Sequence, residues 1–186
     1  MNRESHGFKP WEDVNDREPA EVTNLDRYGN PELPWSRARD ALAAAASGPD
    51  IIYFLGTSRS DGRPHAAGVG AMWDEGELYL TSGAKARKAR NLAANPACTI
   101  SVKLEGIDLV LEGEAIRVTD KGPLERLAGR YRAVGWPAEV DGAALTAPFS
   151  APSAGPPPWQ LYRFVLQIGF GVATEEPYGA TRWRLR

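Results

Sequence analysis

The chain has 186 residues, of which 42% are apolar and 25% are charged, and its formal net charge at pH 7 is −2. This length and composition indicate a globular domain that buries roughly 70% of its unfolded surface, so that no disulfide or structural metal is required. The near-neutral charge argues against binding to nucleic acid or to an anionic membrane surface, and no apolar run approaches the ~20 residues of a membrane-spanning helix.

The cysteine count and the first residues indicate the compartment. Cys98 is the single cysteine, which excludes an intramolecular disulfide and a cysteine-based metal cluster. The opening sequence MNRESHGFKPWED lacks the apolar stretch of a secretory signal. We therefore expect a cytoplasmic protein.

Residues 1–35 are predicted to form an extended arm. They carry eight acidic residues, four basic residues, four prolines and no apolar period. Trp11, Tyr28 and Trp35 are too many large aromatic residues for a fully solvated tail, so the arm is expected to lie against the rest of the chain or against a partner subunit. Residues 36–186 are expected to form a single domain.

The domain is predicted to begin with a helix and to continue as strands. Ser36 would cap the helix, and Gly48 and Pro49 would end it. From residue 51 the hydrophobic period changes to two, and turn sequences such as Ser60-Asp61-Gly62 separate the alternating runs. The predicted strands of this part are residues 51–57, 64–73, 77–81, 98–104 and 107–118, with a short helix over 84–94.

The last third of the chain is predicted to contain a helix, a long loop and a final strand. The helix begins near Pro123 and ends before Gly135. Residues 140–158 are rich in Ala, Pro, Ser and Gly and predict a loop, which is either a cover over a site or a disordered insertion. Residues 159–170 predict the last strand. The whole pattern indicates a mainly β fold of the α+β class, with a small antiparallel sheet or barrel.

The end of the third predicted strand and the helix after it carry the strongest signal for a binding site. The strand ends at Thr81 and Ser82, and the helix opens with Lys85, Arg87 and Lys88 and no acidic residue. Cations at the positive end of a helix dipole are unfavourable unless an anion lies there. A phosphate held by backbone N–H groups, the two hydroxyls and the three cations would remove this conflict.

The alternative is that these cations form an ordinary solvated face. A helical wheel places the apolar Ala86, Ala89, Leu92 and Ala93 on one arc. The opposite arc carries Arg87, Lys88, Arg90 and Asn91. On spacing alone the two interpretations have about equal weight.

Residues 66–71 read Ala-Ala-Gly-Val-Gly-Ala, a strand with almost no side-chain bulk. Glycine weakens a strand, so Gly68 and Gly70 suggest that a flat group approaches the backbone closely. The alternative is a bulge or a barrel corner. The pattern GxGxxG is absent here, which excludes a Rossmann-type site.

Residues for catalysis by the protein itself are few. His6 and His65 are the only histidines, too few for a histidine-rich metal site, and His65 at a strand start is typical of a surface residue or of one with satisfied hydrogen bonds. Cys98 occupies an apolar strand position and is expected in the core. No serine has the surroundings of a nucleophile elbow, and no pair of carboxylates stands out. A bound cofactor is therefore expected to carry the reaction.

The order of the elements and one motif resemble a known family. The motif reads Ser82-x-x-Lys85-x-x-Lys88-x-x-Asn91-Leu92 and is followed by Asn95-Pro96. Residues 36–133 resemble the flavin/deazaflavin oxidoreductase branch of the pyridoxamine 5′-phosphate oxidase-like split β-barrel superfamily. The resemblance implies a six-stranded antiparallel split β-barrel with flanking helices. It also implies a homodimer with FMN or the deazaflavin coenzyme F-420 at the subunit interface.

The resemblance implies roles for particular residues. Those beside the cofactor ring would be Gly68, Val69 and Gly70. Those at its phosphate would be Thr81, Ser82, Lys85, Arg87 and Lys88. Three further candidates are Trp73 and Trp183 for packing near the ring and Arg182 for an anionic group of cofactor or substrate, and the loop over 140–158 is a candidate lid.

Two departures separate the chain from enzymes that oxidise pyridoxamine phosphate. Such oxidases place an Arg and a Lys on the second strand, where this chain has the small residues 66–71, and they end in an Arg-Leu-x-x-Arg-type motif, where residues 182–186 read Arg-Trp-Arg-Leu-Arg. We therefore expect hydride transfer to or from another small organic substrate. The alternative is a non-catalytic flavin- or haem-binding protein on the same fold.

Overall fold

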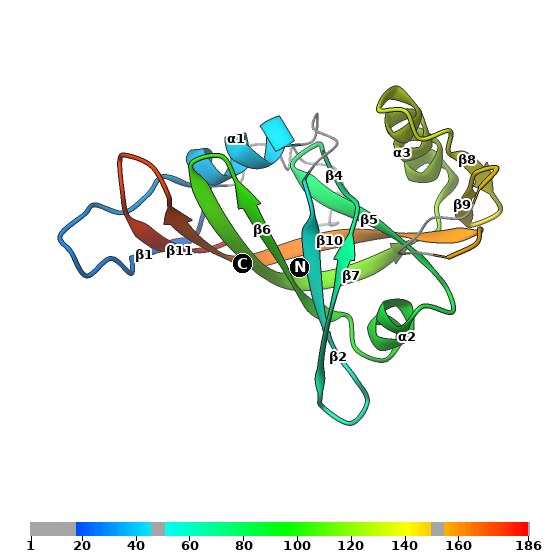
Figure 1. The fold of residues 1–186 in the computed structure, drawn as a ribbon, viewed down its shortest axis with the longest axis horizontal. Helices are drawn as coiled ribbons and strands as arrows, with labels where there is room; N and C mark the ends of the chain where they lie inside the picture. The colour runs from blue at the N-terminus through cyan, green and yellow to red at the C-terminus, as the bar shows by residue number, and fades with distance from the viewer. Residues whose placement is uncertain (1–17, 46–50, 150–154, 186) are drawn as a thin grey trace, which may run out of the picture.

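The computed structural model describes residues 18–45, 51–149 and 155–185, which form three helices and eleven strands (Figure 1). His6 and Trp11 lie outside these ranges. No helix within the ranges is long and apolar enough to cross a membrane.

The elements have the following bounds. The helices are α1 (Trp35–Ala45), α2 (Arg87–Ala94) and α3 (Lys121–Ala133). The strands are β1 (Glu21–Asn24), β2 (Tyr53–Ser58), β3 (Pro64–Val69), β4 (Ala71–Asp74), β5 (Glu77–Gly83), β6 (Ala97–Leu104), β7 (Ile107–Val118), β8 (Glu139–Asp141), β9 (Ala144–Thr146), β10 (Trp159–Ala173) and β11 (Ala180–Arg184).

The described strands belong to one antiparallel sheet. Its main path runs β1-β11-β10-β7-β6-β2-β3, while β5 also pairs with β10, β4 pairs with β5, and the hairpin of β8 and β9 joins β10. The predicted mainly β, antiparallel fold with helices is confirmed. The sheet has eleven strands rather than the expected six. The difference arises because the arm, the tail and the 140–158 segment also supply strands, and because Gly70 divides one predicted strand.

β3 and β4 are consecutive along the chain but pair with different neighbours. They are separated only by Gly70, and β3 pairs with β2 whereas β4 pairs with β5. The single strand expected over 64–73 is therefore two strands. Among the described strands, β3 has no partner on its other edge. α2 contacts both β2 and β5 and so connects the hairpin of β2 and β3 with the hairpin of β4 and β5 (Figure 1).

The described part of the N-terminal segment is tied to the sheet. β1 pairs with β11, and Trp35 contacts Trp183 edge-on with 5.4 Å between the ring centroids. Leu33 is buried, whereas Tyr28 is 93% exposed. α1 begins at Trp35, so that Ser36, the expected cap, is already inside the helix.

Buried apolar side chains form two clusters on opposite faces of β5 and β10. Leu80 and Phe164 belong to the larger cluster, under α1, whereas Tyr79 and Leu161 belong to the smaller one, under α3. Successive residues of a strand point to opposite faces, so one strand contributes to both clusters. The side chains that α3 buries are Leu124, Leu127, Ala128 and Tyr131.

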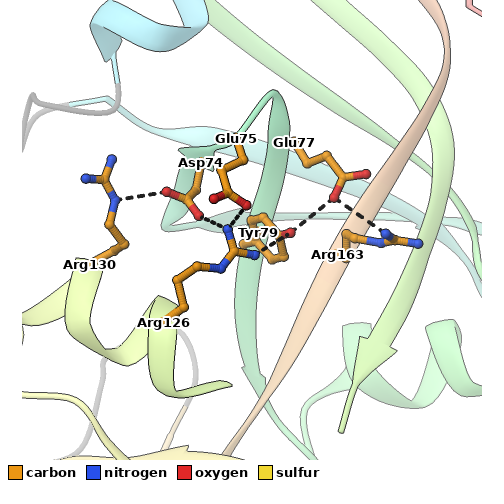
Figure 2. A network of polar contacts seen from close by, with 7 residues as sticks. All are labelled: Asp74, Glu75, Glu77, Tyr79, Arg126, Arg130 and Arg163. Atoms are coloured by element: carbon orange, nitrogen blue, oxygen red, sulfur yellow. Dashed lines mark hydrogen bonds and ion pairs between the residues drawn. The ribbon is translucent and has the colours of Figure 1, made fainter. Parts of the chain in front are cut away.

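Charged side chains hold α3 against the turn between β4 and β5 (Figure 2). Asp74, only 6% exposed, accepts from Arg126 Nη1 at 2.7 Å and from Arg130 Nε at 2.9 Å. Arg126 also pairs with Glu75 and lies 5.9 Å from the ring centroid of Tyr79. A buried carboxylate requires such partners because desolvation of an unpaired charge is costly. The network therefore fixes the position of α3 and has a structural role.

Candidate functional site

The candidate site lies where α2 meets the ends of β2, β3 and β5. Lys88, Asn91 and Leu92 are buried on the inner face of α2. Asn91 Nδ2 donates to Thr57 Oγ1 at 2.9 Å, and both side chains are buried. Thr57 Oγ1 in turn donates to the backbone carbonyl of His65 at 3.3 Å. These contacts join α2 to the hairpin of β2 and β3.

The inner face of α2 corrects the helical-wheel expectation. Lys88 and Asn91 do not lie on a solvated face but point toward β2, whereas Ala93, expected with the apolar residues, is exposed. Positions i and i+3 share one face of a helix, so Lys88 and Asn91 are necessarily on the same side. The polar Thr57 on β2 is what makes this side suitable for them.

Four basic side chains gather at this junction, and we call them the basic pocket: Arg59, His65, Arg87 and Lys88. Burial, and then the charges of Arg59, Arg87 and Lys88, lower the pKa of His65. His65 Nδ1 and Arg59 Nε are buried without a hydrogen-bond partner among the described residues. Unpaired buried donors are costly, and an anion placed here would accept from them.

Lys88 contributes a buried ammonium group to the basic pocket. Its side chain is only 4% exposed, and this burial lowers the pKa of Lys88. Burial disfavours the charged form of an amine, and a negative charge nearby favours it again. An anionic ligand would therefore stabilise Lys88 in its ammonium form.

The helix starts later than expected. α2 begins at Arg87 rather than near residue 84, and its N-cap residue Ala86 has no side chain that could cap the first N–H groups. Lys85 precedes the helix and is exposed. Of the expected cations, only Arg87 and Lys88 stand in the first helical turn. The uncapped N–H groups are suitable donors for an anion.

Thr81 and Ser82 do not point in the same direction. Leu80 faces the larger cluster and Tyr79 the smaller one, so the next two residues of β5 alternate in the same way. Ser82 is fully buried, and its hydroxyl donates to the carbonyl of Gly83 at 3.4 Å. The two side chains therefore leave β5 on opposite faces, and their contact with one anion stays a prediction.

The small residues of β3, and Gly70 directly after it, leave one face of the sheet open. Ala66 and Gly68 are on the face opposite to Val69, whose side chain is 5% exposed and points into the core. A Cβ added at Gly70 would meet no atom within 4 Å, and one at Gly68 would meet only Ile52, at 3.7 Å. Gly68 and Gly70 therefore leave the backbone accessible, and Val69 offers only its backbone.

A hollow of about 420 Å³ lies on the same side of the sheet and reaches His65. Its lining includes Gly56, Ser58, Ala66, Thr99 and Glu112. Cys98 also lines it, and burial raises the pKa of this thiol to about 12, which makes it a poor nucleophile. Among the described residues, no group of three or more His, Cys, Asp and Glu side chains could hold a metal ion.

Two predicted site residues, Arg182 and Trp183 of β11, lie away from the basic pocket. Trp183 is fully buried, and its Nε1 donates to the carbonyl of Leu33 at 3.0 Å, so it has no surface to offer to a ring. Arg182 pairs with Glu21 and Thr23, each at 3.0 Å. In the single chain Trp183 is packed against Trp35, and Arg182 is engaged by residues of β1, so neither is free for a ligand as it stands.

Trp73 and the predicted lid also differ from expectation. Trp73 of β4 is buried and lines a small cavity of about 40 Å³ beside α1. Its partner on β5 is Leu78, which precedes Ser82 by four residues. In the segment over 140–158, β9 forms a hairpin with β8 and pairs with β10. This part is not a free loop, and residues 150–154 lie outside the described ranges.

Sequence reasoning missed Arg59 and assigned no role to His65. The turn over 60–62 fixes the hairpin register, in which Thr57 lies opposite His65. That register, read from the turn, would have placed His65 beside an inward-facing polar residue rather than at the surface.

Comparisons with known proteins agree with this architecture. A family model described as pyridoxamine 5′-phosphate oxidase matches residues 40–154. A solved NimC/NimA family protein from Clostridium acetobutylicum is 17% identical, with 79% of this chain and 90% of that chain covered and a TM-score of 0.56. A heme-binding protein from Mycobacterium smegmatis is 18% identical, with 77% and 56% covered and a TM-score of 0.50.

Another solved structure, an F420 reductase, is 24% identical, with 68% of this chain and 93% of that chain covered and a TM-score of 0.46. No curated protein sequence matches the chain. At these identities, the solved structures show a shared fold and nothing more.

Proposed function

Because the chain belongs to the pyridoxamine 5′-phosphate oxidase family, we propose that it is an oxidoreductase that binds FMN or the deazaflavin coenzyme F-420. It would transfer a hydride to or from a small organic substrate. The observation that carries the proposal is the basic pocket, in which three cations and a histidine lie close together. Two of its members, Arg59 and His65, each have a buried side-chain nitrogen without a hydrogen-bond partner among the described residues.

The residues of the basic pocket fit the phosphate of such a cofactor. Arg87 and Lys88 belong to the first turn of α2, whose N–H groups lack a side-chain cap, and Arg59 approaches from the hairpin turn. Charge-assisted hydrogen bonds from arginine, lysine and backbone N–H groups are the usual means of holding phosphate. We assign Lys88 and Arg87 as phosphate ligands. Lys85 and Thr81, which precede α2 in the sequence, stay candidates for the same phosphate.

The open face of β3 fits the ring. Gly68 and Gly70 present backbone without side chains, and the free edge of β3 offers N–H and C=O groups that no described strand uses. A flat heterocycle with donors and acceptors on its edge would be held by such a strand without a clash. The bound flavin or deazaflavin supplies the redox chemistry, and the chain supplies the phosphate anchor, the orientation of the ring and the exclusion of water.

The proposed substrate is not pyridoxamine phosphate. The face of β3 that would carry an Arg and a Lys carries Ala66 and Gly68, and the C-terminal Arg182 is engaged by Glu21. The substrate is therefore expected to be a different small organic molecule, held in the hollow beside β3.

A second copy of the chain is part of the proposal. On the outward face of the sheet, Phe54 and Val110 are 52% and 41% exposed and flank Ser101 on neighbouring strands. Val172, on the same face, is 54% exposed. A row of exposed apolar residues next to the hollow favours a symmetric dimer, with a cofactor near the interface of the two subunits.

Cofactor binding and turnover test this proposal separately. FMN and F-420 are each titrated into the purified protein while the fluorescence of the ring is followed, and haem is titrated with its absorbance as the signal. A dissociation constant below about 100 μM for FMN or F-420 is expected. If neither binds, the proposal is wrong.

Turnover is measured with the cofactor that binds. The reduced cofactor is mixed under anaerobic conditions with a panel of small carbonyl, nitro and unsaturated compounds, and its reoxidation is followed by absorbance. Reoxidation that depends on protein supports an oxidoreductase. Binding without turnover in either direction, or binding of haem alone, would indicate the non-catalytic alternative.

A further inference from the structure

We propose that His65 binds the anionic group of the ligand through Nδ1 and takes up a proton when that anion arrives, so that the affinity for the ligand decreases as pH rises. The inference deepens the proposed function and rests on it for the identity of the ligand as a cofactor phosphate. The same coupling between binding and protonation of His65 is expected when the ligand is inorganic phosphate.

The position of His65 is fixed by its backbone rather than by its ring. Its carbonyl accepts from Thr57 Oγ1, which itself accepts from Asn91 of α2. The imidazole makes no such contact: Nδ1 is buried and has no hydrogen-bond partner among the described residues. His65 lies opposite Thr57, so its side chain is on the face of the hairpin that meets α2. A buried ring nitrogen without a partner, facing the cations of α2, is available to an anionic ligand.

The charges around His65 come from three elements. Arg59 in the hairpin turn and Arg87 and Lys88 on α2 are positive, and with burial they lower the pKa of His65. In the same turn, Asp61 is the nearby carboxylate, and it pairs with Arg63, with 2.6 Å between Arg63 Nη2 and Asp61 Oδ2. This pair adds no net charge next to His65.

The remaining neighbours are uncharged or lie across the hollow. Thr57 on β2 and Asn91 on α2 carry no charge, and the thiol of Cys98 on β6 is neutral because burial raises its pKa to about 12. Glu112 on β7 is the carboxylate that shares the lining of the hollow. Cations thus outnumber carboxylates at this histidine.

This arrangement couples protonation to binding. In the free protein the imidazole is neutral at pH 7, because its pKa is lowered from the ordinary value of 6.5. A phosphate that lies among the cations offsets their charge and accepts from the ring, which raises the pKa of His65. The contribution of His65 to affinity is therefore full below its free-state pKa and is lost as pH rises through its ligand-bound pKa.

The direct test measures His65 in the wild-type protein by NMR. With two histidines in the sequence, the imidazole signals of His6 and His65 are assigned by comparison with His65→Asn. Each is titrated from about pH 5 to 8, without ligand and with saturating inorganic phosphate or FMN. The expected result is a titration midpoint of His65 that moves upward with ligand, while that of His6 does not move.

Calorimetry adds the functional readout. Proton uptake is obtained from binding enthalpies in buffers of different ionisation enthalpy, for wild type, His65→Asn and the control Arg90→Gln, which removes an exposed charge from α2. Between pH 6 and 8 the dissociation constant of wild type is expected to increase by about tenfold relative to that of His65→Asn. Ionisation of the phosphate itself affects every variant equally.

The outcomes separate this inference from the proposed function. If FMN binds but the midpoint of His65 is unchanged and wild type and His65→Asn show parallel pH profiles, the inference is wrong and the cofactor proposal stands. If phosphate shifts His65 but neither FMN nor F-420 binds, the inference stands for an anion and the cofactor proposal fails. If phosphate, FMN and F-420 all fail to bind, both are wrong.

Discussion

Gly70 stands between β3 and β4, and a Cβ added there would meet no atom of the described chain within 4 Å. Gly70→Val is therefore expected to change the free energy of unfolding by less than about 1 kcal/mol. If a flat ring lies on this backbone, the same substitution places a branched side chain against the ring. We expect the affinity for FMN or F-420 to fall by at least about tenfold, which corresponds to about 1.4 kcal/mol. Urea unfolding and fluorescence titration measure the two effects, and unchanged affinity would place the ring elsewhere.

At the same scale, the residues of the basic pocket could be predicted only in part. Arg87 and Lys88 follow from the motif and from the sign of the charges at a helix start. The burial of Lys88 could not be predicted from a helical wheel, because it depends on a polar partner surface on β2, which a wheel does not contain. His65 was missed for a related reason, since a strand start with a neighbouring proline suggests a surface position until Thr57 is placed opposite it.

Trp183, in the C-terminal tail, is a residue that the sequence suggests for the site but that the structure buries in the core. From the sequence, Trp183 is a candidate for packing near a cofactor ring. In the structure its indole is covered by Trp35 and bonded to Leu33. That contact spans 150 residues of sequence, and no local pattern predicts it.

At the scale of elements, α3 provides a test of how helices are fixed to the sheet. Asp74 is 6% exposed and is held by Arg126 and Arg130 of α3 (Figure 2). Asp74→Asn leaves the two arginines without their shared carboxylate, and we expect a loss of about 1–3 kcal/mol in the free energy of unfolding. The matched control is Glu125→Gln, which breaks the exposed pair with Lys121 and should cost no more than about 0.5 kcal/mol. Equal effects of the two substitutions in urea unfolding would contradict this assignment.

Alternating strands were the most predictable elements. β6 and β7 match the expected bounds to within one residue, because buried and exposed positions alternate along most of both strands, and period two is the direct signature of a half-buried strand. β8 and β9, with three residues each, are too short to show a period. β9 is fixed by the pairing of Leu145 with Trp159 of β10, a tertiary contact.

At the scale of the whole molecule, the outward apolar face predicts association of two chains. Val110 lies on this face and is 41% exposed, whereas Val134, 57% exposed, lies at the end of α3. Val110→Asp is expected to convert a dimer to a monomer in light scattering at micromolar concentration, because it places a charge in an apolar interface. Val134→Asp introduces the same change elsewhere and should leave the dimer intact. A monomeric wild-type protein would contradict the proposed assembly.

The charge of the whole chain is compatible with a small anionic ligand. A net charge of −2 disfavours a polyanion such as nucleic acid. The cations of the basic pocket are nevertheless concentrated at one junction of α2 with the sheet. Such a local cluster of cations is suited to one phosphate rather than to a charged polymer.

The central claim is that the basic pocket holds the phosphate of a redox cofactor, and a comparison of ligands with and without that group tests it most directly. The affinities of FMN and riboflavin, and of F-420 and its phosphate-free deazaflavin, are measured for wild type, Lys88→Met and the control Arg90→Gln. Lys88→Met keeps the apolar stem and removes the charge, so it should weaken the phosphorylated ligand by about 10- to 100-fold and leave the phosphate-free ligand unchanged. Arg90→Gln should change neither. Equal losses for both ligands, or a wild-type protein that binds riboflavin as tightly as FMN, would contradict the claim.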